Sequence, residues 1–520
     1  MESIETVVEL LFCAILLALI ARRARIPYPV ALVIGGLLLA FVPGPPVILN
    51  PDLALTLFLP PVLYQAALDA SWRDTRQNLG SISLLATGLV VFTTTAVAAV
   101  AHFLVPGMGW APGFVLGAIV SPSDAVAATA VMQRLSISRR IVTVVEGESL
   151  VNDATGLVFY KYSIAAVVAG TFSFPEAAAD FLLIGGGGVA IGLAFGWIFV
   201  KLQRGLNDPL IESTYSLLLP FAIYITAQYV GVSGVLAVVA AGLVRGHYYP
   251  EILSARTRVQ ALLTWDVVIF ILNSLSFVLI GLQLRGLMPW LMQHSALTMI
   301  GVPVAISAVV ILTRIVWVFS MGYAASLFSK PAPNPRSLMV VAWTGMRGIV
   351  SLATALALPV EIVAGREFPY RNLIVFTAFS VILATLVIQG LTLGPLIRLL
   401  GLHADNTTAR EEAVARLEAA KAALVALAKL PNEATPDRRA LHRLRSDYER
   451  RIADLHGTSS TASAPVLQFV QTDAQFRSLR VVALAAERTQ IVAMRNRSII
   501  GDEVLHRIER ELDLEELEIT

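Results

Sequence analysis

The sequence predicts an all-α polytopic membrane protein with a helical, water-exposed tail. Of its 520 residues, 56% are hydrophobic and 15% are charged, and the mean hydropathy is +0.72. Soluble domains usually have about a quarter of their residues charged. The charge is also uneven, because residues 403–520 hold 36 of the 76 charged side chains. We therefore place a transmembrane domain at 1–402 and a helical cytoplasmic tail at 403–520.

The first apolar helix is expected to be retained rather than cleaved. It begins with Glu2, Glu5 and Glu9, whereas a signal peptide begins with a basic segment. The single cysteine, Cys13, excludes an intramolecular disulfide. The net charge of +2 says little about partners. We expect the protein to lie in a lipid bilayer and to have no nucleic-acid partner and no cofactor.

Thirteen segments are long and apolar enough to span a bilayer, which takes about 20 residues per helix. They are 5–21, 27–43, 51–70, 79–104, 112–133, 141–168, 180–201, 210–230, 232–249, 262–284, 295–328, 336–358 and 372–400. The charge-free run 213–244 is too long for one crossing and short for two. Two crossings put 15 basic residues in the cytoplasmic loops and 3 in the opposite loops. The positive-inside rule then places the N-terminus outside and the tail in the cytoplasm. Within the tail, helices are expected at 408–428, 437–455 and 476–511.

Polar residues from three of these segments are predicted to meet at one depth. At 1.5 Å per residue, Asp153 lies about 20 Å into a core about 30 Å thick. By the same measure, Asp124 lies at about 18 Å and Arg347 at about 16 Å. A charge at bilayer depth is costly, and an intramembrane acid usually marks an ion or proton pathway. The sequence therefore predicts a midplane ion site.

Two of the crossings are predicted to be discontinuous. Ser121-Pro122-Ser123 interrupts the fifth, since proline removes a backbone hydrogen bond and disfavours helix before it. Gly345 and Gly348 flank Met346-Arg347 in the twelfth. Transporters with inverted repeats use paired broken helices, seven apart as here, to line a midplane ion site.

The charges at this depth suggest distinct roles. Arg347 stays protonated and needs a carboxylate partner, for which Glu148 is a better candidate than Asp153. A carboxylate held by arginine would be unavailable for cycling, which leaves Asp153 as the free acid. Ser149, one turn earlier, offers a neutral oxygen to a hard cation. Arg314 in the eleventh crossing also needs a partner, which the sequence does not identify.

Four motifs carry a family resemblance. LPPVLYQAAL at 59–68, SPSDAV at 121–126, EGESLVNDATG at 146–156 and GMRGIVSLA at 345–353 closely resemble the monovalent cation/proton antiporters of the NhaP and sodium/proton exchanger branch. The resemblance covers about residues 5–402. It implies thirteen helices in inverted repeats, working as a homodimer in the cell (inner) membrane. Helices four to six and eleven to thirteen would form the moving ion-carrying bundle, and helices one to three and seven to ten the dimer scaffold.

The resemblance also assigns residues. Asp153 would carry either the proton or the cation, with Ser149, Ser123 and the surroundings of Asp124 supplying further oxygens and Asn152 beside them. Glu148 and Arg347 would form a structural ion pair. An Asn-Asp pair, here Asn152-Asp153, goes with electroneutral exchange. Where the family often has an acid, this chain has Gln65, which can bind a cation but cannot carry a proton.

The predicted function is electroneutral exchange of one monovalent cation, first of all Na+, for one proton by competition at Asp153. A K+/H+ or Na+,K+/H+ exchanger is the near alternative, and a cation channel is a further one. From another class, Asp124 and Asp153 could form an intramembrane aspartyl enzyme. The tail could be regulatory, could serve assembly, or could be a solvated appendage.

Overall fold

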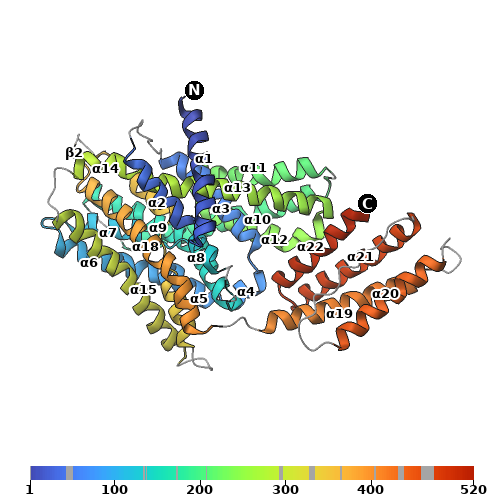
Figure 1. Ribbon diagram of the computed structural model, residues 1–520. Coiled ribbons are helices and arrows are strands. Elements are labelled where there is room, and N and C mark those ends of the chain that lie inside the picture. The colour runs from blue at the N-terminus through green and yellow to red at the C-terminus, as the bar shows by residue number, and fades with distance from the viewer. Residues whose placement is uncertain are drawn as a thin grey trace.

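The computed structural model describes residues 2–42, 51–132, 135, 137–170, 174–206, 208–291, 297–326, 334–362, 366–402, 406–430, 438–457 and 474–519. Within them the chain is almost entirely helical. One short antiparallel ribbon, β1 (Glu361–Ile362) with β2 (Arg366–Glu367), is the exception. Figure 1 shows a body of packed helices with a helical tail extending from one side.

The first half of the body contains a long series of helices. They are α1 (Glu2–Ala24), α2 (Tyr28–Ala40), α3 (Pro51–Asp69), α4 (Trp72–Gln77), α5 (Leu79–Ser83), a π-helical stretch η1 (Leu84–Leu89), α6 (Val90–Leu104), α7 (Trp110–Val120), α8 (Ala125–Met132) and α9 (Arg139–Ala169). The second half contains α10 (Phe174–Gln203), α11 (Pro209–Val230), α12 (Gly234–Ile252), α13 (Ala255–Leu282), α14 (Leu284–Leu291), π-helical η2 (Leu297–Gly301), α15 (Val302–Ser326), α16 (Pro335–Trp343), α17 (Ile349–Leu356) and α18 (Arg371–Leu400). Every predicted crossing thus corresponds to a helix or to consecutive helical pieces.

The ambiguous run at 213–244 folds as two helices, as predicted. Gly231 has a φ of +84°, a left-handed conformation that glycine adopts without strain, and it ends α11. Ser233 then caps α12 by accepting a hydrogen bond from the backbone N–H of Leu236 at 3.2 Å. Helix α10 packs tightly against this turn, because a Cβ on Gly188 of α10 would lie 2.5 Å from the carbonyl oxygen of Ser233.

Seven helices among the described residues are long and apolar enough to cross a membrane. They are Leu79–Leu104, Trp110–Met132, Ala179–Gln203, Pro209–Val230, Ala255–Met288, Met299–Ala324 and Arg371–Leu400. Helix α9 is outside this group because its polar site residues lower its hydropathy. The chain is therefore a multi-span helical membrane protein, while the count of thirteen crossings and the inverted repeats stay predictions.

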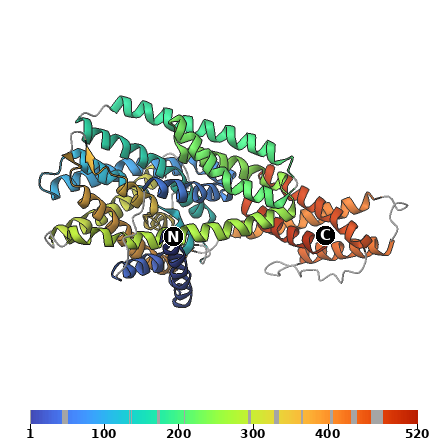
Figure 2. The same ribbon diagram turned by 90° about the horizontal axis from the view of Figure 1, so that it is seen from above.

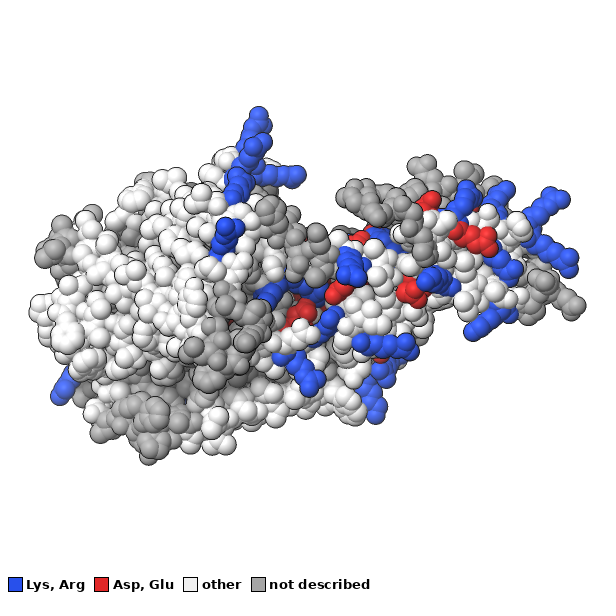
Figure 3. Space-filling view, turned by 90° about the horizontal axis from the view of Figure 1, so that it is seen from below, with Lys and Arg blue, Asp and Glu red and all other residues white. Residues whose placement is uncertain are grey.

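The tail contains four helices among its described residues, α19 (Asn406–Ala428), α20 (Arg438–Gly457), α21 (Ala474–Asn496) and α22 (Asp502–Ile519). The single helix predicted at 476–511 was wrong, because the chain turns between α21 and α22. Ser498 there has a φ of +59°, which ends the helical backbone. Figure 2 shows the tail projecting from one end of the body, and Figure 3 shows charged side chains gathered on the tail and at its junction.

Helix α22 lies between the body and the rest of the tail (Figure 1). Arg258 of α13 donates from Nε to Oδ2 of Asp513 at 2.7 Å, and a second bond from its guanidinium makes the pair bidentate. Both side chains are buried. At the same junction, Arg495 of α21 donates to the carbonyl oxygen of His247 at 2.8 Å. The tail is thus bound to the body through buried charged contacts.

Candidate ion-binding site

Two helix breaks cross at the centre of the body, as the sequence predicts. One separates α7 from α8 at residues 121–124, and the other separates α16 from α17 at residues 344–348. The backbone N–H of Asp124 donates to the carbonyl oxygen of Met346 at 2.8 Å, so one break satisfies a polar group of the other. Gly348 permits this approach, because a Cβ there would lie 2.0 Å from Oδ2 of Asp124.

The N-terminus of α8 is held by two side chains of the predicted site. Oδ1 of Asp124 accepts a hydrogen bond from the N–H of Val126 at 2.8 Å. Oγ of Ser149, on α9, accepts one from the N–H of Ala125 at 3.2 Å. Both satisfy N–H groups that the first turn of a helix leaves without partners. The break therefore brings α8 and α9 together at the site.

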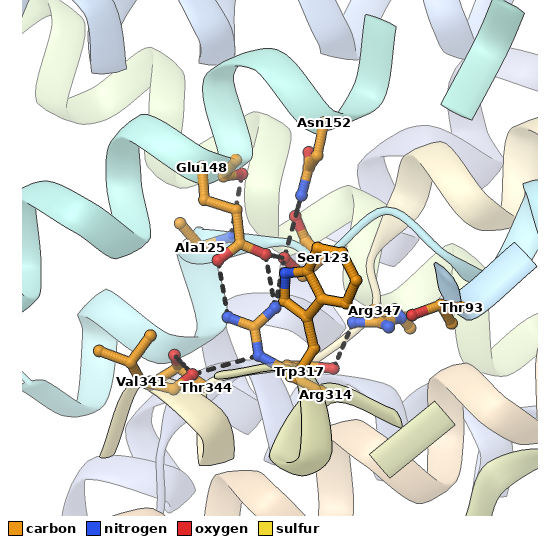
Figure 4. Close-up of polar contacts among 12 residues, drawn as sticks. Thr93, Ser123, Ala125, Glu148, Asn152, Arg314, Trp317, Val341, Thr344 and Arg347 are labelled. Carbon is orange, nitrogen blue, oxygen red and sulfur yellow. Dashed lines mark hydrogen bonds and ion pairs between the residues drawn. The ribbon is translucent and has the colours of Figure 1, made fainter. Parts of the chain in front are cut away.

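The predicted ion pair between Glu148 and Arg347 was wrong, because Glu148 pairs with Arg314. The guanidinium of Arg314 meets both oxygens of this carboxylate, with Nη2 to Oε2 at 2.7 Å (Figure 4). Both side chains are almost fully buried. Nε of Arg314 also donates to the carbonyl oxygen of Val341 at 3.1 Å. The bidentate geometry compensates for burying the two charges.

Arg347 is buried just as completely but is bound by backbone carbonyls. Its Nε donates to the carbonyl oxygen of Val120 at 2.6 Å and its Nη1 to that of Gly345 at 2.6 Å. Val120 is the last residue of α7, where carbonyl groups lack helical partners and the helix dipole favours a cation. Because the end of α7 satisfies its guanidinium, Arg347 needs no carboxylate partner, contrary to the prediction from the sequence.

Asn152 and Ser123 extend the Glu148–Arg314 pair into a network. Oγ of Ser123 donates to Oε1 of Glu148 at 2.7 Å. The amide of Asn152 donates to the carbonyl oxygen and to Oγ of Ser123, each at 3.0 Å (Figure 4). All of these side chains are buried. The network thus fixes the break residue Ser123 against α9.

Asp153 lies outside this network and faces a cavity. It is 6% exposed, and among the described residues no hydrogen bond or ion pair to its carboxylate is found. The cavity offers about 150 Å³ of space for water-sized molecules. Three more carboxylates line it, from Asp69, Asp124 and Glu146. A buried acid that faces an open cavity rather than a fixed cation can exchange protons and cations.

The cavity brings together part of the predicted cation site. Ser123, Asp124, Ser149 and Asp153 line it, whereas Asn152 stands behind Ser123. Gln65 lies outside it and donates from Nε2 to Oδ2 of Asp69 at 3.0 Å. Asp69 and the partner of Glu148 were not predicted. The sequence feature that could have identified Asp69 is its position as an acid one turn after Gln65, at the end of an apolar helix.

Comparison with known proteins identifies the class of the chain. Residues 9–399 match the family of the transmembrane sodium/hydrogen exchanger. A protein of Mycobacterium tuberculosis, described as an uncharacterized Na+/H+ exchanger, is 34% identical over 99% of this chain and 95% of its own length. The sodium, potassium, lithium and rubidium/H+ antiporter of Bacillus subtilis is 35% identical over 71% of this chain and 57% of its own.

Among solved structures, the sodium proton antiporter MjNhaP1 of Methanocaldococcus jannaschii is similar with a TM-score of 0.59. The two sequences are 20% identical, and the similarity covers 77% of this chain and 99% of MjNhaP1. At that identity the similarity shows the fold alone. The family match and the sequence relatives decide the class of the protein and exclude the aspartyl enzyme. The chain belongs to the sodium/hydrogen exchanger family and is an NhaP-type cation/proton antiporter of the membrane, not an enzyme.

Proposed function

We propose that this protein exchanges one Na+ for one proton across the cell (inner) membrane, with Asp153 as the shared carrier. The carboxylate binds either a proton or a cation, and the loaded site is then exposed to the other side. The Asp153 side chain is neutral with either ion bound, which reduces the cost of moving its charge through a low-dielectric layer.

One observation carries this proposal: Asp153 is buried, faces a cavity and has no fixed partner among the described residues. The other acids nearby differ from it. Glu148 is neutralised by Arg314, and Asp124 caps α8. Asn152 next to Asp153 is a neutral amide bound to Ser123. With Asp153 as the one residue that carries the transported ion, the expected ratio is one to one and transport is electroneutral.

The cavity wall supplies the oxygens that a hard monovalent cation prefers. Besides the carboxylate of Asp153, these are the hydroxyls of Ser123 and Ser149 and the carboxylate of Asp124. We assign these four residues to the cation site. Gln65 is not among them, since it lies outside the cavity and contacts Asp69.

Alternating access would move one group of helices past another. We assign the moving bundle to α5–α9 and α15–α18, which contain both broken helices, and the scaffold to α1–α3 and α10–α13. The scaffold would hold two copies together as a homodimer. The N-terminus would lie outside and the tail in the cytoplasm, in accord with the basic loops.

Proton flux into proteoliposomes tests the proposal. Asp153→Asn, which keeps the side-chain shape but cannot bind a proton, should abolish cation-driven dissipation of a pH gradient. Asp180→Asn, a change at an exposed acid bonded to Tyr162, should leave it unaltered. Persistent exchange by purified Asp153→Asn protein would show that another residue carries the ions.

A second candidate is K+/H+ or mixed Na+,K+/H+ exchange by the same mechanism. This candidate is supported by the Bacillus subtilis relative, whose name lists sodium, potassium, lithium and rubidium. The same assay with Li+, Na+ and K+ distinguishes the candidates by their half-saturating concentrations. Gln65→Glu should be measured beside the wild type, because it restores an acid at a position that is neutral here.

A further inference from the structure

Asp69 stands where two cavities meet. The first cavity contains Asp153, Asp124 and Glu146. The second lies between the body and the tail, with Arg258 and Trp265 of α13 and Glu509 of α22 in its wall. Among the described residues, Asp69 is the one that lines both. Asp69 is the last residue of α3, and it is exposed.

The carboxylate of Asp69 is oriented but not neutralised. Gln65, one turn earlier on α3, donates its amide to Oδ2 at 3.0 Å. No lysine or arginine within the described part of the chain forms an ion pair with it. One amide contact fixes the direction of a carboxylate and leaves its charge available to a passing cation.

A second carboxylate lines the cavity that Asp69 shares with the carrier. Glu146 lines the same cavity and precedes Asp153 by seven residues on α9, about 10 Å along the helix. Asp153 faces this space with its own carboxylate buried and without a partner among the described residues. Carboxylates therefore line the cavity from Asp69, which also faces the second cavity, to the carrier, and each can replace part of the hydration of a hard cation.

We infer that Asp69, oriented by Gln65, is the residue at which cations enter and leave the cavity of Asp153 on the tail side, with Glu146 as the step between them. This inference rests on the proposed function of Asp153. A negative charge in a cleft with low-dielectric walls raises the local cation concentration. Asp69 therefore sets the apparent affinity for the cation and the rate of its arrival, while Asp153 sets whether exchange occurs at all.

The test is exchange by full-length protein in proteoliposomes, with Na+ added either on the tail side or on the opposite side. Asp69→Asn keeps an amide near Gln65 and removes the charge. For Na+ on the tail side, the apparent KM should rise about tenfold, because the charge that concentrates the cation at the mouth of the cavity is lost. The maximal rate and the KM from the opposite side should stay near the wild-type values.

Two variants serve as controls. Asp69→Glu keeps the charge and should keep the KM within about twofold of the wild type. Glu251→Gln removes an acid at the same end of the body that lines neither cavity and should leave the KM unchanged. Raising the ionic strength with choline chloride should shrink the difference between Asp69→Asn and wild type, because salt screens the charge.

An unchanged KM in Asp69→Asn, or an equal rise in Glu251→Gln, would overturn the inference. So would an equal rise for Na+ on both sides, since Asp69 would then act beyond the tail side. Failure of the proposed function has a different signature, which is persistent exchange in Asp153→Asn. If exchange stops in Asp69→Asn as it does in Asp153→Asn, the inference is wrong because Asp69 is then itself a carrier.

Discussion

Two buried arginines at the centre of the molecule are stabilised in different ways. Arg314 forms a bidentate pair with the carboxylate of Glu148, whereas Arg347 donates to carbonyl oxygens of Val120 and Gly345. A carboxylate partner cancels the charge outright, and a helix end offers only partial negative charge. The first arrangement fixes α15 against α9, and the second holds the two helix breaks together.

Removing Arg314 should destabilise the protein because it leaves Glu148 buried without a partner. Breaking one side of a buried ion pair costs about 3 to 5 kcal/mol. Arg314→Met should therefore lower the midpoint of thermal unfolding in detergent. Adding Glu148→Gln to Arg314→Met should recover much of the loss, because the uncompensated charge is gone. Equal stability of the wild type and Arg314→Met would contradict the pairing.

Gly348 should tolerate no side chain. A Cβ at this position would lie 2.0 Å from Oδ2 of Asp124, which caps α8. Gly348→Ala should thus displace the crossing of the breaks, at a cost of about 1 to 3 kcal/mol, and reduce the exchange rate. Gly186→Ala is the matched control, since nothing lies within 4 Å of a Cβ there. Equal exchange rates in the two variants would show that the crossing adapts.

At the scale of elements, the docking of α22 contains a titratable contact. Glu509 is buried beside Arg258 of α13 and Asp513 of its own helix, and burial raises the pKa of Glu509 from its ordinary 4.5 to about 7. The charges that also act on it are Arg488 and Arg495 of α21, and Tyr249 of α12 lines the same cavity. Between about pH 4.5 and pH 7, docked α22 therefore holds a proton that the released helix would lose.

The pH dependence of docking follows from the direction of each pKa shift. Because the pKa of Glu509 is raised, its contribution is fully present below about pH 4.5 and is lost as the pH rises to about 7, by about 1.4 kcal/mol per pH unit. His506 acts in the opposite sense. Burial lowers its pKa below the ordinary 6.5, so its contribution is lost as the pH falls below that value.

Single variants separate these two groups. In His506→Gln, docking should weaken as the pH rises from about 4.5 to about 7, and in Glu509→Gln it should strengthen as the pH rises toward 6.5 and then stay level. Hydrogen–deuterium exchange of the α22 amides across this range measures the docking. Identical pH profiles for both variants would show that neither group controls it.

At the scale of the whole molecule, one exchangeable carboxylate predicts transport without net charge movement. A transported net charge would feel about 2.3 kcal/mol per 100 mV of membrane potential. With fixed Na+ and proton gradients, potentials of either sign set by K+ and valinomycin should leave the initial rate of Na+/H+ exchange unchanged. A rate that follows the potential would exclude the ratio of one to one, and a conductance would indicate a channel.

The sequence alone determined the class of the molecule and the location of its centre. Long apolar segments without charge have few stable solutions other than spanning helices, and the acids and breaks at 121–126, 146–156 and 345–353 marked the site. Depth placed Asp124 and Asp153 in one layer, helical spacing placed Ser149 one turn before Asp153, and the family resemblance added Ser123. All four line one cavity.

Tertiary structure decided which residues in that layer touch. Depth could not distinguish Arg314 from Arg347 as the partner of Glu148, because rotation about the helix axes sets the contacts and both arginines reach the centre. Nor could it show that a helix end would satisfy Arg347, or that Asp69 joins two cavities formed by α3, α9, α13 and α22. Side-chain pairing between distant segments depends on packing, and packing is a property of the whole fold.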